Sequence, residues 1–282
     1  YPPSVPSLPP GLQRDLWQDV YGQQLAISII LRALQAHTQN KHPTKPLVMS
    51  FHGSNGNGKT FISKIIAKNL YPQGVRSRFL HQFHPTLHFS NALNVPLYKA
   101  QLQNWIQGNV SICPSSLFIF AEMDHMPYGL IDAVTPFLYH QQAFKGLSYG
   151  KAIFIFISNI GGDRINEKML EAWRKNSTRE EIQLKDLEPL LASTAFRNRD
   201  SGFWHSDLIQ RNLIDYYIPF LPLERQHVIE CIKAELRSRG YNQHPEDVIQ
   251  QIGSELTDFP PEEKIFSSHG CKTVATKVAL HY

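Results

Sequence analysis

The sequence predicts an α/β protein with a mostly parallel sheet flanked by helices, followed by a small helical lid domain. Short apolar runs alternate with helical patterns between residues 47 and 223, whereas the residues beyond 223 show only helical patterns. Such alternation is typical of parallel strands joined by crossover helices. We therefore expect an extended proline-rich arm over 1–10, a large α/β domain over 11–220 and the lid domain over 221–282.

Composition and charge exclude several classes of protein. The 282 residues suffice for a large core, and 42% hydrophobic with 18% charged residues is ordinary for a globular chain. A net charge of +4 is too weak to indicate a nucleic-acid partner. Because no run of 18 apolar residues occurs, we expect no transmembrane helix. The first residue is Tyr1, so a signal peptide would not be visible in this chain.

The chain before residue 47 predicts an arm and two helices. Residues 1–10, "YPPSVPSLPP", contain five prolines and favour an extended conformation. Apolar residues then recur at helical spacing from Leu12 to Leu34, on either side of a break at Gly22. A polar link, "NKHPTKP", follows.

The next stretch predicts the sheet. The apolar runs 116–120 and 151–158 have no polar face, as expected for central strands covered on both sides. The strands are expected at 47–52, 78–84, 116–120 and 151–158, and the helices at 59–70, 96–109 and 128–140.

A last strand and the lid domain complete the chain. Residues 215–223, "DYYIPFLPL", predict an edge strand, and Pro219 and Pro222 suit a domain boundary. Helical patterns over 224–240, 245–256 and 270–280 predict a lid domain with no strong strand.

One motif carries specific chemistry. "GSNGNGKT" satisfies G-x-x-x-x-G-K-[ST], a chance match with odds of about one in a hundred in a chain this long. A buried strand precedes it and a helix follows, which is the context of a P-loop. Its backbone amides would surround phosphate, Lys59 would reach the β- and γ-phosphates, and Thr60 would bind Mg²⁺. We therefore predict ATP contacts from Gly53, Ser54, Asn55, Gly56, Asn57, Gly58, Lys59 and Thr60.

Two further polar residues follow predicted strands. Glu122 comes after "LFIFA" and is placed to polarise a water, although a surface glutamate is the plainer alternative. Asn159 comes after "AIFIFIS" and could sense the γ-phosphate, although asparagine is also a common turn residue. The position before Glu122, where a metal-holding aspartate is usual in such sites, is Ala121. Asp124 could substitute for it or merely cap a helix near Pro127.

Weaker signals receive structural interpretations. "GLSYG" around Ser148 lacks the strand-before, helix-after context of a nucleophile elbow. His81, His84 and His88 lack thiolate or carboxylate neighbours for zinc. Three cysteines are too few for a disulfide scaffold. Two N-x-S/T sequons make Asn109 and Asn176 glycosylation candidates and favour the secretory pathway.

With these pieces assembled, the chain resembles the torsins, AAA+ ATPases of the endoplasmic reticulum and nuclear envelope. The resemblance extends from about Gly11 to the C-terminus and rests on five segments. The sequence of the last segment, "FSSHGCKTVA", is most similar to the torsin-2 branch. The segments are "KPLVMSFHG", "FIFAEMDHM", "KAIFIFISNIGG", "SGFWHSDLIQRNLIDYYIPFLPLE" and "FSSHGCKTVA".

The resemblance implies roles for matching residues. Glu122 would be the catalytic glutamate, Asn159 the first sensor, and Lys272 a second sensor that reaches ATP from the lid. It also implies a chaperone-like remodelling role in the lumen of the endoplasmic reticulum or nuclear envelope. Cys231 and Cys271 could pair there and make the nucleotide response redox-sensitive, or remain two buried thiols.

The resemblance also implies partners. A homo- or hetero-oligomer would contain a membrane-anchored activator of the lamina-associated polypeptide type, which supplies the arginine finger that torsins lack. No nucleic-acid partner is expected.

Three positions depart from the usual torsin pattern. Ser54 stands where Trp is usual, Thr60 where Asn is common, and Ala121 where the metal-holding Asp is usual. Thr60 favours metal binding, but Ala121 removes an ordinary magnesium contact. We expect ATP binding to survive and hydrolysis to be weak. The competing hypothesis is a non-hydrolysing nucleotide-binding scaffold for the same partner. A P-loop kinase is a further alternative, against which "GCKTVA" in a helical tail argues.

Overall fold

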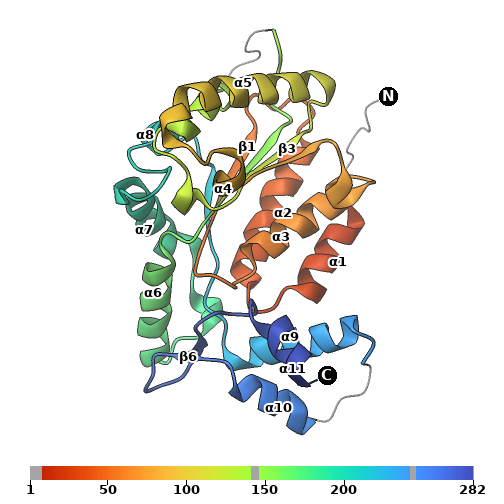
Figure 1. Ribbon diagram of the computed structural model, residues 1–282, viewed down its shortest axis with the longest axis vertical. Coiled ribbons are helices and arrows are strands. Elements are labelled where there is room, and N and C mark those ends of the chain that lie inside the picture. The colour runs from red at the N-terminus through yellow and green to blue at the C-terminus, as the bar shows by residue number, and fades with distance from the viewer. Residues whose placement is uncertain (1–7, 141–145, 242–245, 282) are drawn as a thin grey trace.

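A five-stranded parallel sheet forms the centre of the computed structural model, which describes residues 8–140, 146–241 and 246–281 (Figure 1). The strands lie in the order β2-β3-β4-β1-β5, and every neighbouring pair is parallel. Their bounds are β1 Leu47–His52, β2 Leu80–Phe83, β3 Leu117–Phe120, β4 Ile153–Ser158 and β5 Tyr216–Pro219. The predicted parallel sheet, its two-sided strands β3 and β4 and the edge position of β5 are confirmed.

The two faces of the sheet are covered by different helices. Alternate residues of each strand enter different cores: Phe154 packs in one cluster, and Ile155 in the other. Helices α1 Pro10–Asp19, α2 Gln24–Gln39 and α3 Lys59–Leu70 contribute to the core that contains Ile155. The opposite face packs against α5 Val95–Ile112, η4 Leu130–Phe137, α6 Gly162–Arg174 and α7 Leu184–Arg197. Both faces of the sheet are therefore covered by apolar side chains, which explains the apolar runs of the central strands.

The segment predicted as a helix over 128–140 differs from that expectation. The structure forms a 3₁₀-helix, η4, whose N-cap Gly129 is left-handed and whose interior contains Pro136. Proline lacks the amide hydrogen and clashes with the preceding turn of an α-helix, so a regular α-helix is disfavoured here. The remaining short elements are η1 Gly74–Arg76, α4 Pro85–His88, η2 Ala92–Asn94, η3 Met123–His125, η5 Arg179–Glu181 and α8 Asp207–Gln210.

Within the described residues, the C-terminal part contains three helices. They lie at the bottom of Figure 1. Helices α9 Arg225–Ser238, α10 Glu246–Ser254 and α11 Val274–His281 share a core of their own, which begins at Leu223. The structure adds a two-stranded hairpin, β6 Asp258–Phe259 and β7 Phe266–Ser267, that the sequence did not predict. Strands of two residues are too short to leave a periodic pattern.

The structure tests the predicted arm and the expected lack of a transmembrane helix only in part, and it does not test the predicted domain boundary. Residues 1–7, most of the predicted arm, lie outside them, and α1 begins at Pro10. The proposed division at 220/221 stays a prediction. Within the described ranges, none of the helices has both the length and the apolarity that crossing a bilayer demands.

Candidate functional site

The P-loop follows β1 directly and depends on glycine at two close approaches. At Gly53 (φ 151°), an added Cβ would lie 2.5 Å from Phe220 O, and at Gly56 (φ 82°) it would lie 1.8 Å from His269 O. Only glycine tolerates such positions without displacing backbone. Left-handed Gly58 then caps α3, so the helix begins at Lys59 with its amides directed at the loop.

Lys59 is held by three oxygen acceptors. Its Nζ donates to Gly53 O (2.5 Å), Ser54 O (2.9 Å) and Asn159 Oδ1 (3.0 Å). Burial lowers the Lys59 pKa to about 8; Asp124 opposes this shift, and the nearby charge of Lys272 adds to it. Two cationic side chains, one from the P-loop and one from the C-terminal part, therefore contribute positive charge to the same region.

A cavity of about 710 Å³ lies beside the P-loop, a volume suited to a nucleotide. It brings together Asn55, Gly56, Asn57, Gly58, Lys59, Thr60, Glu122, Asn159 and Lys272. The other two predicted loop residues lie outside its lining. Gly53 serves through its carbonyl, and Ser54 Oγ accepts a hydrogen bond from Asn166 Nδ2 (3.1 Å) on α6. Asp19, Val20 and Tyr21 also line the cavity, and no pattern in the sequence identified them.

Glu122 and Asp124 lie in the turn that follows β3. Glu122 has a left-handed backbone (φ 53°, ψ 48°) and an exposed side chain, and it caps η3. Ala121 is buried and its amide donates to Phe83 O (2.9 Å). Asp124 accepts hydrogen bonds from Ser158, the last residue of β4, and from Asn159, which follows it. The suggested helix cap at Asp124 is wrong, because Gly129 caps the following helix.

The C-terminal part docks directly on the P-loop. Cys271 N donates to Gly56 O (3.1 Å), and an added Cβ at Gly270 (φ 52°) would lie 2.4 Å from the same oxygen. Cys271 forms a disulfide with Cys231 of α9, with Cα atoms 6.1 Å apart. Lys272, the next residue, lines the cavity. Whether the redox state of this disulfide alters nucleotide binding stays a prediction.

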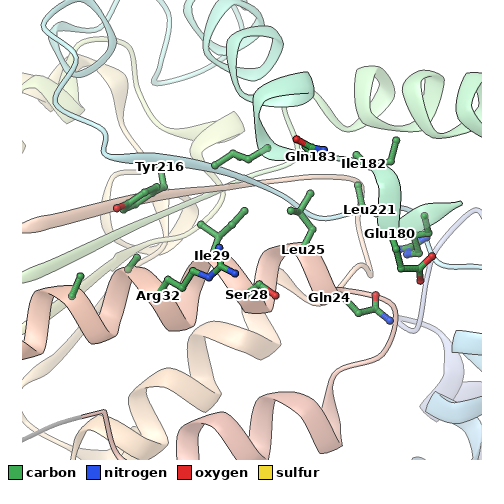
Figure 2. A pocket seen from close by; sticks show the side chains of 14 residues that line it. Gln24, Leu25, Ser28, Ile29, Arg32, Glu180, Ile182, Gln183, Tyr216 and Leu221 are labelled. Atoms are coloured by element: carbon green, nitrogen blue, oxygen red, sulfur yellow. The ribbon is translucent and has the colours of Figure 1, made fainter. Parts of the chain in front are cut away.

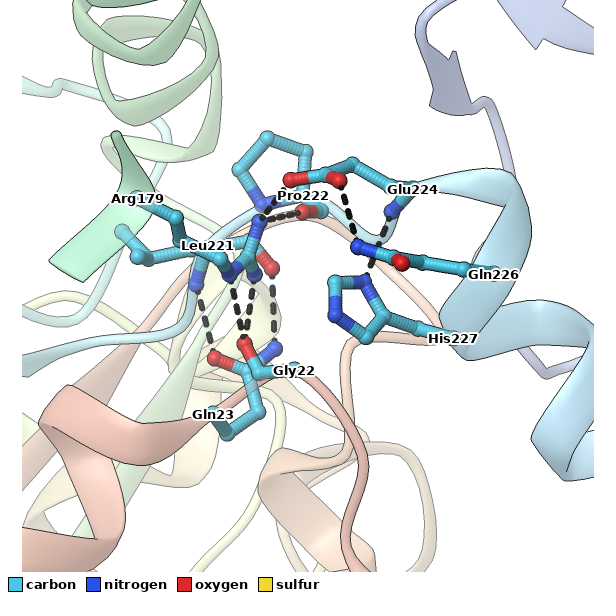
Figure 3. Close-up of polar contacts among 8 residues, drawn as sticks. All are labelled: Gly22, Gln23, Arg179, Leu221, Pro222, Glu224, Gln226 and His227. Atoms are coloured by element: carbon cyan, nitrogen blue, oxygen red, sulfur yellow. Dashed lines mark hydrogen bonds and ion pairs between the residues drawn. The ribbon is translucent and has the colours of Figure 1, made fainter. Parts of the chain in front are cut away.

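A buried arginine joins three segments where the chain enters its C-terminal part (Figure 3). Arg179 donates to Gly22 O through Nε (3.0 Å) and Nη2 (2.5 Å), and to Pro222 O through Nη1 (2.7 Å). Its Nη1 also lies 3.4 Å from Glu224 Oε1. Next to it, Gln23 bonds Leu221 in both directions and donates to Asn57 O (3.0 Å). The cavity wall at residues 19–21 is therefore tied to both the P-loop and the start of α9.

The cavity offers more groups that suit the phosphates of ATP than protein oxygens that could bind a metal ion. Gly58 has open space where a Cβ would lie, and the buried Asn57 Nδ2 has no protein partner. Such an amide and two lysines suit phosphate oxygens. For Mg²⁺, Thr60 offers a hydroxyl, but the Ala121 side chain offers no oxygen and both Asp124 carboxylate oxygens already accept hydrogen bonds. The site would bind the metal mainly through phosphate oxygens, Thr60 and water.

A second cavity of about 660 Å³ lies outside the sheet, between α2 and the segment around η5. Figure 2 shows Leu25, Ile29 and Arg32 of α2 among its lining side chains. The lining is mostly apolar and includes the buried Arg179. It contains none of the predicted site residues.

Of the remaining candidate residues, Asn109 and Asn176 lie outside the lining of the nucleotide cavity. Asn176 is exposed after α6, whereas Asn109 lies within α5, where its Nδ2 donates to Trp105 O (2.8 Å). Glycosylation of either stays a prediction. Of the three histidines, His84 alone lines the cavity. The described residues contain no group of three His, Cys, Asp or Glu that could hold a metal ion.

Two family models match the chain. One, described as Torsin, matches residues 4–120, and the other, described as Torsin-1A, C-terminal domain, matches residues 223–282. The two matched ranges together cover more than half of the chain. They do not distinguish the torsin-2 branch, which stays a prediction.

Two solved structures of Hsp104 share the fold. They are a closed-state cryo-EM reconstruction with ATPγS and FITC casein (TM-score 0.63) and the S. cerevisiae Hsp104–ADP complex (TM-score 0.64). Both are 16% identical in sequence, and the match covers 95% of this chain but 45% and 46% of theirs. This chain thus spans less than half the length of those proteins. The likeness shows an AAA+ fold.

Proposed function

Because the chain belongs to the torsin family of AAA+ ATPases, we propose that it binds ATP in the cavity between the P-loop and the C-terminal helices and hydrolyses it weakly. The observation that carries the proposal is the convergence of Lys59, Glu122, Asn159 and Lys272 on one cavity beside an intact P-loop. These residues come from the segments that follow β1, β3 and β4 and from the C-terminal part, and a nucleotide is the ligand that uses all of them.

Each residue has a proposed role. The loop amides and Lys59 bind the phosphates, Thr60 contacts Mg²⁺, and Glu122 polarises the attacking water. Asn159 positions the groups around the γ-phosphate, and Lys272 binds the nucleotide from the C-terminal side. The exposed Glu122 and the direct contact of Cys271 with Gly56 support this assignment.

The cellular setting is proposed from the family. Torsins are associated with the lumen of the endoplasmic reticulum and nuclear envelope, and we propose this location and a chaperone-like remodelling role for this chain. AAA+ proteins act as oligomers, and we propose that a membrane-anchored partner of the lamina-associated polypeptide type supplies an arginine finger. The disulfide between Cys231 and Cys271 supports an oxidising compartment.

Ala121 favours a second candidate function, a nucleotide-binding scaffold that engages the same partner without turnover. The buried methyl group offers no oxygen at the place where a carboxylate would orient the metal. Binding can persist without that carboxylate, because the P-loop supplies most of the contacts. Turnover depends on the metal's position, which sets the electrostatic stabilisation of the transition state.

Steady-state phosphate release with and without the activator separates the two functions. We expect slow release from the wild type and, in Ala121→Asp, an increase of roughly 10- to 100-fold, the usual effect of one well-placed partner of a metal site. Ala121→Asn is the matched control, because it adds nearly the same volume without the charge. Equal rates in all three proteins would show that Ala121 does not limit hydrolysis, and no release from the wild type even with activator would favour the scaffold.

A further inference from the structure

We propose that Asp124 is a positioning residue that fixes the side-chain amide of Asn159, so that its oxygen faces Lys59 and its nitrogen faces away. The inference rests on the proposed function of the cavity, since it assigns the group that orients one of its polar side chains. Asp124 lines the same cavity, but its carboxylate bonds to protein groups at the end of β4.

The turn after β3 places Asp124 beside the end of β4. Glu122 adopts a left-handed conformation, which a non-glycine residue rarely takes, and η3 follows at once. His125 N donates to Glu122 O (2.8 Å), which closes the turn, and the buried Met123 anchors it in the core. Such a backbone persists only where its surroundings over-determine it. The turn keeps Glu122 exposed while it directs Asp124 toward Asn159.

Both carboxylate oxygens of Asp124 are occupied by donors from the β4 end. Oδ1 accepts from Ser158 Oγ (2.5 Å) and from Asn159 N (2.9 Å). Oδ2 accepts from Asn159 Nδ2 (2.8 Å) and, at 3.1 Å, from the same backbone amide. This arrangement leaves little capacity for a metal ion, so Asp124 is not a substitute for the carboxylate missing at Ala121.

The chemistry of the pair decides the orientation of the amide. An ionised carboxylate only accepts hydrogen bonds, so the Asn159 side chain must direct its NH₂ group at Asp124. Its Oδ1 is then the atom left to meet Lys59 Nζ, at 3.0 Å. Lys59 only donates, so the reversed amide would set an NH₂ group against an ammonium. The chain of contacts from Lys59 through Asn159 to Asp124 therefore has one consistent direction of donation.

A purely structural strap between two loops is the alternative, and exchanging the two residues distinguishes it. In the exchange variant Asp124→Asn/Asn159→Asp, the new amide at position 124 can accept from Ser158 and from the backbone amide of position 159. Its NH₂ group can donate to the new carboxylate at position 159, whose second oxygen can accept from Lys59. Every hydrogen bond is retained except the longer contact (3.1 Å) of the backbone amide of position 159 with the second oxygen of residue 124, while the negative charge moves from one position to the other. Asp124→Asn alone leaves two amides facing each other and forces one contact to fail.

The experiment measures ATP affinity by calorimetry for the wild type, both single variants and the exchange variant, with thermal unfolding as the check of folding. We expect Asp124→Asn to lose roughly tenfold or more in affinity. The exchange variant should recover to within about threefold of the wild type, because the two changes compensate each other within one hydrogen-bonded pair. Ser158→Ala removes the bond from Ser158 Oγ to Asp124 and the bond that Ser158 Oγ accepts from Ile160 N, but it leaves the amide pairing, so it should lose less ATP affinity than Asp124→Asn.

A ligand-free measurement keeps this test separate from that of the proposed function. NMR hydrogen exchange of side-chain amides should show a protected Asn159 NH₂ in the wild type and a protected NH₂ group at position 124 in the exchange variant. A wild type that binds no ATP but shows this pattern overturns the proposed function and leaves the orientation intact. A folded exchange variant that binds no better than Asp124→Asn, or a wild type with an unprotected Asn159 amide, overturns the inference.

Discussion

At the scale of single residues, the nucleotide cavity depends on places where two backbones approach without side chains between them. Gly56 of the P-loop and Gly270 of the C-terminal part face each other, and the amide of Cys271 donates to the Gly56 carbonyl. Both glycines have positive φ, which most other residues adopt only with strain. The P-loop is therefore positioned by the C-terminal part as well as by the sheet.

Gly56→Ala should weaken ATP binding while the protein remains folded. The new Cβ would lie 1.8 Å from His269 O at φ 82°, so the P-loop or the segment after β7 must move. Strain of about 1–3 kcal/mol would lower the affinity by roughly 5- to 150-fold, as calorimetry can measure.

Gly108→Ala is the matched control. Gly108 lies in α5, and an added Cβ would have nothing within 4 Å. This change should raise the free energy of unfolding by about 0.5–1 kcal/mol and leave ATP affinity unchanged. Equal ATP affinities of the two variants would contradict the proposed role of the glycine contact.

At the scale of elements, Arg179 of η5 connects the turn before α2 with the start of α9. Its guanidinium is buried and donates to the carbonyls of Gly22 and Pro222, both of which are buried residues. Glu224 balances part of its charge, while burial lowers the Arg179 pKa below its ordinary value. The neighbouring His227 Nδ1 accepts from Glu224 N (3.2 Å) and completes the cap of α9.

Arg179→Met should destabilise the protein by about 2–4 kcal/mol, because it leaves two buried carbonyls without donors and Glu224 without its cation. The free energy of unfolding in urea measures the loss. Arg174→Met is the control, since Arg174 is exposed and its ion pair with Glu263 should contribute less than about 1 kcal/mol. A loss no greater than that of the control would mean that the buried network contributes little.

At the scale of the whole molecule, two buried histidines make the fold sensitive to acid. Burial lowers the pKa of both His52 and His81 to about 4. For His52, Lys59 lowers it further, while the bond to Ile160 O and the charge of Asp124 oppose the shift. His81 stacks on Phe118. Both are neutral in the folded protein at about pH 5, whereas unfolded histidine, with a pKa near 6.5, is mostly charged.

The free energy of unfolding should therefore fall as the pH falls from about 6.5 toward 4, because the unfolded state binds more protons there. Each histidine contributes at most about 2 kcal/mol of this loss between about pH 7 and 5. His81→Phe should flatten the pH dependence, and the exposed His42→Phe should not. Urea unfolding at several pH values measures this, and parallel curves for wild type and His81→Phe would contradict it.

The elements that the sequence predicted are those with strong local patterns. Strand β1 and helix α3 match their predicted bounds, because an apolar run, the P-loop glycines and Pro72 with Gly74 delimit them. The 3₁₀ form of η4 and the β6–β7 hairpin were missed. Apolar spacing does not separate a short 3₁₀-helix from an α-helix, and two-residue strands carry no period.

The residues of the site also divide into those that a local sequence pattern identifies and those that it does not. The P-loop motif is contiguous, so its residues could be named from the sequence, and the resemblance supplied Lys272. The pairing of Asp124 with Asn159 and of Arg179 with Gly22 spans 35 and 157 positions. A single sequence carries no signal for contacts between residues so far apart in the chain, because these contacts form only when the chain folds.

Calorimetric titration of ATP into the wild-type protein, with Mg²⁺ and with a chelator, tests the central claim most directly. If the P-loop and the two lysines supply most of the binding and Ala121 leaves the metal weakly held, ATP should saturate one site in both conditions, with affinities within about tenfold of each other. No saturable binding in either condition, or binding that disappears without Mg²⁺, would contradict the account.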